Sequence, residues 1–96
     1  MQKEEIISTL RADMPTLKTK YGVQSIGLFG SFAKGENHKD SDLDFLVEVG
    51  EPLVDNYFGL WDFLENRFEK KIDLVRRGDH LSQKFLAKIQ SYILYV

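Results

Sequence analysis

The stretch GSFAKGENHKDSDLD, residues 30–44, lies between two short apolar segments and decides the fold. The segment before it, residues 26–29, is apolar and is followed by Gly30 and Ser31, a pair that typically ends a strand. The segment after it starts at Leu43 and predicts a second strand over residues 43–49. Residues 30–44 therefore connect two strands, and a short helical turn is expected to begin at Ser31.

Gly30 and Ser31 form a candidate phosphate-binding turn. Glycine allows the backbone to approach a ligand closely. Exposed N–H groups at the start of a helix, together with a serine hydroxyl, are suited to binding phosphate oxygens. The pair therefore predicts a phosphate site at the end of the first strand.

Asp42 and Asp44 are two residues apart at the start of the second strand. Alternate strand residues share one face, so the two carboxylates repel each other unless a cation lies between them. Mg²⁺ is suited to such a pair, because phosphate oxygens and water complete its ligand shell. The alternative is an ordinary turn, in which aspartate only accepts backbone hydrogen bonds. The neighbouring phosphate turn favours the metal interpretation.

The residues Gly-Ser at 30–31, Gly35 and Ser-Asp-Leu-Asp at 41–44 resemble, at this spacing, the signature of the polymerase-β-like nucleotidyltransferases. The resemblance is closest to the minimal nucleotidyltransferases and covers nearly the whole chain. These proteins are often encoded beside a HEPN-domain protein, as antitoxin and toxin. The resemblance implies a third aspartate on a later strand, and Asp73 in the segment Ile-Asp-Leu-Val supplies it.

The resemblance also implies an activity: transfer of a nucleoside monophosphate, AMP from ATP, to a hydroxyl acceptor, with loss of pyrophosphate. Two Mg²⁺ ions would assist the transfer. Lys34 follows Ser31 closely and could reach the triphosphate, or it could be a solvent-exposed loop lysine. The resemblance assigns catalysis and metal binding to Asp42, Asp44 and Asp73, and nucleotide binding to Gly30, Ser31, Lys34 and Gly35.

A HEPN toxin is the partner that the resemblance implies, with one of its tyrosine hydroxyls as the acceptor. Two alternatives remain. The first is transfer to a small molecule such as an aminoglycoside, although enzymes of that kind generally carry an added helical domain. The second is a non-catalytic antitoxin that neutralises the HEPN partner by binding alone, and three intact aspartates argue against it.

Length and composition indicate one domain spanning residues 1–96. Thirteen Lys and Arg residues against 15 Asp and Glu give a net charge of −2, so no global basic excess attracts a nucleic-acid template. The chain has no cysteine. No apolar run reaches the length of a membrane span, and the start of the chain does not resemble a signal peptide. A cytoplasmic location is therefore expected.

Apolar periodicity predicts a two-layer α/β fold in the order αβαβαβα, with helices on a small mixed sheet of about three strands. Pro15 is expected to kink or restart the first helix, Gly22 to end it, and Asp79 to cap a last helix that reaches Ile93. A turn is expected at residues 50–52. The first two strands should be antiparallel and the third parallel to the second, which brings Asp42 and Asp73 together. The apolar tail, residues 92–96, either joins the core or faces a partner in a homo- or hetero-oligomer.

Overall fold

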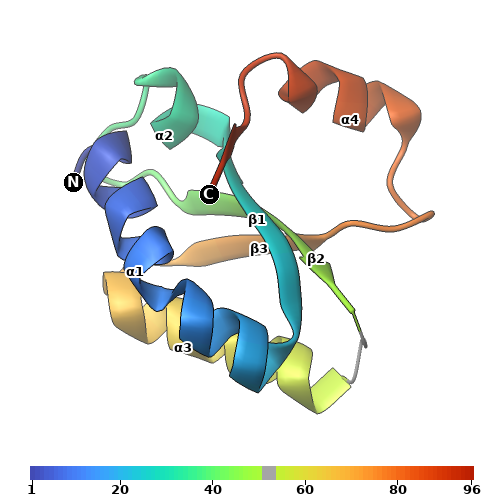
Figure 1. Ribbon diagram of the computed structural model, residues 1–96. Helices are drawn as coiled ribbons and strands as arrows, with labels where there is room; N and C mark the ends of the chain where they lie inside the picture. Colours follow the sequence, from blue (N-terminus) through green and yellow to red (C-terminus); the bar gives the residue numbers. More distant parts are fainter. Residues whose placement is uncertain (51–53) are drawn as a thin grey trace.

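The structure is a computed structural model that describes residues 1–50 and 54–96, and the side chains of residues 1–50 and 56–96. Helices and strands follow one another along the described residues (Figure 1). Their bounds are α1 (Lys3–Tyr21), β1 (Val23–Phe29), α2 (Gly30–Lys34), β2 (Leu43–Val49), α3 (Val54–Phe68), β3 (Ile72–Arg76), α4 (Gln83–Gln90) and β4 (Leu94–Tyr95).

The strands form one mixed sheet in the order β3-β2-β1-β4. β1 and β2 are antiparallel, and β2 and β3 are parallel, as the sequence predicts. The short loop from α2 to β2 permits the antiparallel pair, while α3 supplies the crossover that a parallel pair needs. The predicted α/β class, with helices on a small mixed sheet, is confirmed.

The sheet has a fourth strand that the sequence analysis did not predict. β4 pairs antiparallel with β1, so that Tyr95 lies opposite Gly27 and Leu94 opposite Leu28. The N–H of Val96 also donates to the carbonyl of Ile26 at 3.1 Å. This pairing occupies an edge of β1 that would otherwise be open. The tail therefore joins the sheet and packs against the core, which is the first of the two predicted alternatives.

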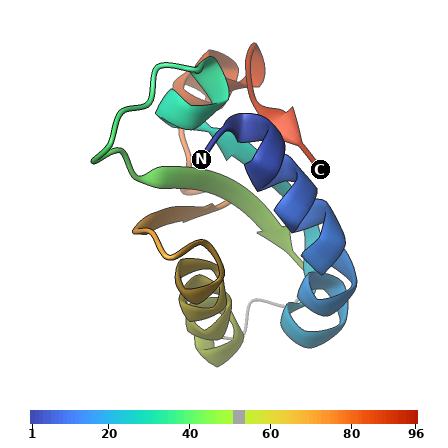
Figure 2. The ribbon, with the colours of Figure 1, turned by 90° about the vertical axis from the view of Figure 1, so that its left-hand side faces the viewer.

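Side chains alternate along the strands, so the sheet has two faces. Helices lie on both sides of the sheet (Figure 2). One face carries side chains such as Ile26 and Phe45 and is covered by α1 and α3, which together make the main core. The opposite face carries Phe29 and Leu46, which pack against Ile89 of α4 in a smaller cluster. α4 covers only part of this second face.

Three features of the helices differ from the predictions. α4 ends at Gln90 and does not reach Ile93, because residues 91–92 form a turn that leads into β4. Pro15 lies within α1 and does not divide it. Proline costs the helix one backbone hydrogen bond. The apolar stripe that the helix buries, which includes Leu10 and Leu17, outweighs this loss. α4 begins after Ser82, not Asp79, because the Ser82 hydroxyl accepts the N–H of Phe85 at 3.0 Å.

Three further observations bear on the sequence predictions. α1 ends at Gly22 in the left-handed conformation, as predicted (φ 69°). The turn expected at residues 50–52 lies partly outside the described residues. Among those described, no helix is both long enough and apolar enough to cross a membrane.

Candidate active site

The turn between β1 and α2 brings Gly30 against Asp44 of the neighbouring strand. Gly30 has a φ of +75°, in the region that glycine adopts most readily. A Cβ atom added there would lie 2.8 Å from Cγ of Asp44 and still closer to Oδ2 of that carboxylate. Gly30 therefore leaves the space that the Asp44 carboxylate fills, a reason that the sequence analysis did not foresee.

α2 is a single short helix that presents Ser31 in its first turn. It ends at Gly35, which has a φ of +73° and donates its N–H to the carbonyl of Phe32 at 3.3 Å. The N–H of Glu36 donates to the carbonyl of Ser31 at 2.9 Å. Gly35 thus ends the helix. Direct contact between Gly35 and a bound nucleotide stays a prediction.

Asp42 lies just before β2, and Asp44 lies within it. Both side chains are half-buried. The loop that leads to Asp42 is closed by two hydrogen bonds between His38 and Ser41: the His38 N–H donates to Oγ of Ser41 at 2.9 Å, and the Ser41 N–H donates to the carbonyl of His38 at 3.0 Å. This turn fixes the backbone immediately before the first aspartate.

Asp73 lies opposite Asp44 in the parallel pairing of β2 and β3, and its side chain is exposed. Two side chains of α3 hold the backbone on either side of it. Nε1 of Trp61 donates to the carbonyl of Ile72 at 2.9 Å, and the Tyr57 hydroxyl donates to the carbonyl of Leu74 at 2.6 Å. These aromatic donors therefore fix the edge strand where it carries Asp73.

Asp73 and Asp42 act electrostatically on Asp44. The pKa of Asp44 is raised to about 6, mainly because burial disfavours its charged form, and further because of the negative charges of Asp73 and Asp42. A bound cation would relieve this repulsion, and carboxylate oxygens are ligands that Mg²⁺ prefers. The donor set therefore fits a divalent metal, although no three acidic, histidine or cysteine side chains of the described residues are already arranged as a complete metal site.

The sequence matches the model of the nucleotidyltransferase domain over residues 14–95. The chain belongs to the nucleotidyltransferase family. That assignment confirms the resemblance drawn from residues 30–44 and from Asp73, and it makes the protein a nucleotidyltransferase enzyme.

This nucleotidyltransferase has relatives of similar length. It is 37% identical over 95 residues to a protein of Methanocaldococcus jannaschii that is provisionally named a protein adenylyltransferase, covering 96% of this chain and 95% of the relative. It is 40% identical over 76 residues to the protein adenylyltransferase MntA of Thermococcus cleftensis, covering 78% of this chain and 77% of MntA.

Solved structures share the fold of the nucleotidyltransferase. One chain, provisionally named a minimal nucleotidyltransferase, matches with a TM-score of 0.80 and 26% identity, over 98% of this chain and 95% of its own length. A toxin–antitoxin crystal structure with AMP-PNP matches with a TM-score of 0.67 and 25% identity, over 99% of this chain and 72% of the other.

Lys34 has a contact in this nucleotidyltransferase that the sequence analysis missed. Its Nζ lies 4.6 Å from the centroid of the Tyr92 ring, beyond the end of α4. Tyr92 is 58 residues further along the chain, so no local pattern could have linked the two. The structure thus brings Gly30, Asp44 and Asp73 together, with Asp42 near enough to act on Asp44 and with Lys34 held by Tyr92.

Proposed function

We propose that this nucleotidyltransferase transfers AMP from ATP to a hydroxyl group of a partner protein and releases pyrophosphate. The observation that carries the proposal is the placement of Asp44 directly opposite Asp73, with Gly30 of the β1–α2 turn against the Asp44 carboxylate. The names of the relatives support protein adenylylation, and the AMP-PNP of the toxin–antitoxin structure supports an adenine nucleotide as donor.

The β1–α2 turn would hold the triphosphate. Backbone N–H groups of Gly30 and Ser31, with the Ser31 hydroxyl, would bind the β- and γ-phosphates. Asp42 and Asp44 would then lie beside the α-phosphate, and with Asp73 they would hold two Mg²⁺ ions. When bound, these ions supply positive charge to the phosphates and make the acceptor hydroxyl more acidic.

Asp73 lies on the side from which the acceptor would approach. β3 is at the edge of the sheet, and the Asp73 side chain is exposed while that of Asp44 is half-buried. The acceptor oxygen forms a bond to the α-phosphorus, and the bond from that phosphorus to the bridging oxygen of pyrophosphate breaks. Asp73 would accept the hydroxyl proton of the acceptor.

The acceptor that we propose is a tyrosine of a HEPN-domain toxin, whose adenylylation would neutralise it. The support is the family resemblance, the MntA relatives and the similarity to a toxin–antitoxin structure. The nucleotidyltransferase would then act as the antitoxin of the pair.

The test is incubation of the purified protein with ATP labelled at the α-phosphate, Mg²⁺ and a HEPN protein encoded beside it. Label on a tyrosine of the HEPN protein, lost when that tyrosine is changed to phenylalanine, is the expected result. Toxin neutralised without ATP, and without label, would contradict the proposal and identify a non-catalytic binding module.

A further inference from the structure

Lys34 and Tyr92 are joined by a cation–π contact next to the proposed phosphate turn. Nζ of Lys34 lies 4.6 Å from the Tyr92 ring centroid, within the range of such contacts. Lys34 is three residues after Ser31 in α2, and residues at this spacing share one side of a helix. The ring therefore meets the lysine on the side of α2 that also carries Ser31.

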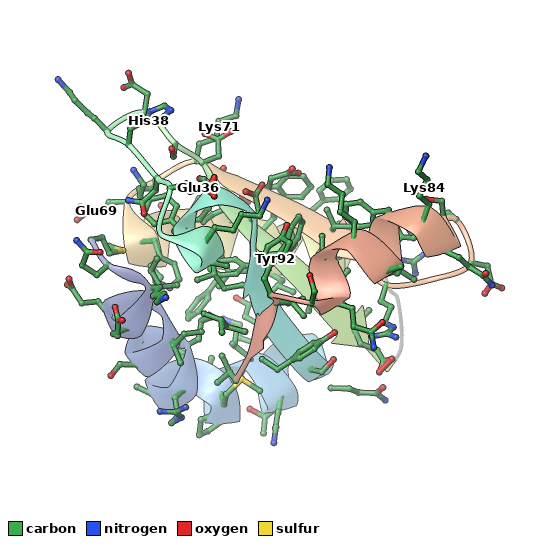
Figure 3. The ribbon with its side chains drawn as sticks, turned by 90° about the horizontal axis from the view of Figure 1, so that it is seen from above. Glu36, His38, Glu69, Lys71, Lys84 and Tyr92 are labelled. Atoms are coloured by element: carbon green, nitrogen blue, oxygen red, sulfur yellow. The ribbon has the colours of Figure 1, made fainter. Side chains whose placement is uncertain are left out.

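The Tyr92 ring is held by the protein scaffold. Its side chain is half-buried and packs against both apolar clusters, and its N–H donates to the carbonyl of Ile89 at 3.0 Å. Figure 3 shows Tyr92 between α2 and α4. The chain then enters β4, which pairs with β1, the strand that leads into Gly30. The position of the ring is thus tied to the strand that carries the phosphate turn.

Tyr92 contacts the apolar clusters of both sheet faces, and one of these faces carries the aspartates. The smaller apolar cluster that it contacts contains Leu46, which is two residues after Asp44 on β2 and therefore on the same face. The contact therefore links Lys34 to a side chain that also packs against the apolar cluster of the aspartate face.

The contact restricts the conformation of the Lys34 side chain and leaves its N–H donors available for hydrogen bonds. A free lysine side chain loses much rotamer freedom when a ligand fixes it. A ring covers one side of an ammonium group, whose three N–H donors can still bind oxygen. The only ion pair among the described residues joins Asp13 and Arg67, so in this part of the chain no carboxylate competes for Lys34.

We propose that Tyr92 is a positioning residue for nucleotide binding, which holds the Lys34 ammonium beside Ser31 so that it meets the terminal phosphates of the donor already ordered. This inference rests on the proposed nucleotide site. It gives the C-terminal segment, which is remote from the signature in sequence, a role in that site.

The test is calorimetric binding of Mg²⁺ and a non-hydrolysable ATP analogue to four variants: Tyr92→Leu, Tyr92→Phe, Lys34→Met and the double variant Lys34→Met with Tyr92→Leu. Removing the ring should weaken binding about two- to fivefold, the affinity equivalent of one exposed cation–π contact. Tyr92→Phe retains the ring and should bind as the wild type does. In the Lys34→Met background, Tyr92→Leu should have no further effect.

Lys20→Met is the matched control. In the wild type, Nζ of Lys20 lies 5.6 Å from the ring centroid of Tyr21 in α1. The variant therefore removes the same charge and a similar contact far from α2. Nucleotide affinity should not change. If Tyr92→Leu does not fold, Tyr92→Met is the ringless replacement. The NMR shift of the Lys34 ε-protons should also move when the ring is removed, in the absence of nucleotide.

Several results would overturn the inference. One is unchanged or tighter binding by the ringless variants, which would mean that the ring is idle or withholds Lys34 from phosphate. Another is that Tyr92→Leu lowers nucleotide affinity equally in the wild-type and Lys34→Met backgrounds. Failure of the proposed function is distinguishable, because the wild-type protein itself would then bind no nucleotide.

Discussion

The carboxylate of Asp44 occupies the space that a side chain at Gly30 would require. The backbone at Gly30, where β1 leads into α2, and the side chain of Asp44 are therefore packed directly against each other. The glycine has a positive φ, and the carboxylate beside it belongs to the adjacent antiparallel strand. The geometry of the phosphate turn and that of the acidic site depend on each other.

Replacement of Gly30 by alanine should therefore lower the rate of nucleotidyl transfer strongly. Gly30→Ala forces the Asp44 carboxylate away from its position, and misplacing a catalytic group by about 1 Å costs roughly 100-fold in rate. Gly22→Ala is the matched control, because Gly22 also has a positive φ (69°) but nothing lies within 4 Å of its added Cβ. Both variants should lose about 1 kcal/mol of stability from the left-handed backbone. Pyrophosphate release that is similar in the two variants would contradict the steric link.

The raised pKa of Asp44 predicts how stability depends on pH. The carboxyl ionises near pH 3.8 in the unfolded chain and near pH 6 in the folded protein, so the folded form binds more protons between these values. Stability is then lost as the pH rises through this interval. Asp44→Asn should be more stable than the wild type at pH 8 and equal to it below pH 3.8, with a gain reduced by solvent screening of the half-exposed carboxyl.

Urea unfolding of the wild type and Asp44→Asn at both pH values measures this difference. Added Mg²⁺ should raise the wild-type midpoint at pH 8, because a cation offsets the repulsion. A wild-type protein that is more stable than Asp44→Asn at pH 8 in EDTA would show that the carboxylates do not repel each other as proposed.

The hydrogen bonds that fix β3 should contribute to stability. Trp61→Phe and Tyr57→Phe each leave one carbonyl of β3 without its donor, and each should cost about 1 kcal/mol in urea unfolding. Phe58→Leu is the control on the same helix, since Phe58 is 58% exposed and its replacement should cost less than about 0.5 kcal/mol. Equal costs in the three variants would mean that these bonds contribute nothing.

The C-terminal strand should be required for stability. Deletion of residues 94–96 removes the pairing of β4 with β1 and the half-buried side chains of Leu94 and Val96, which together should cost about 2 kcal/mol. The melting temperature should fall, and the exposed edge of β1 should increase self-association. An unchanged melting temperature with weaker partner binding would instead restore the view that the tail is a partner surface.

The order of elements, the strand pairing and the signature residues could be predicted because each leaves a local pattern. Apolar runs mark β1 and β2, and a helix-length segment before Asp73 requires the parallel crossover. β4 could not be predicted, because two residues have no period. The start of α4 was misplaced because Asp79 and Ser82 can both cap a helix, and only the folded backbone selects Ser82.

The remaining site features depend on contacts between distant segments. Tyr92 meets Lys34 because the segment after α4 returns to the sheet beside α2. Gly30 lies against Asp44 because β1 and β2 pair in one register. The sequence marks Tyr57 and Trp61 only as aromatic residues on a helix face. Their polar atoms, which need partners when buried, were the signal that could have indicated bonds to the strand edge.

Nucleotidyl transfer by single aspartate variants tests the central claim most directly. Asp42→Asn, Asp44→Asn and Asp73→Asn should each fold and each lower Mg²⁺-dependent pyrophosphate release from ATP by at least about 100-fold, since each removes a charge from the proposed metal site. Glu48→Gln is the matched control, on the same strand and face as Asp44 and four residues away, and it should retain wild-type activity. Activity within a few fold of wild type in any folded aspartate variant would contradict the account.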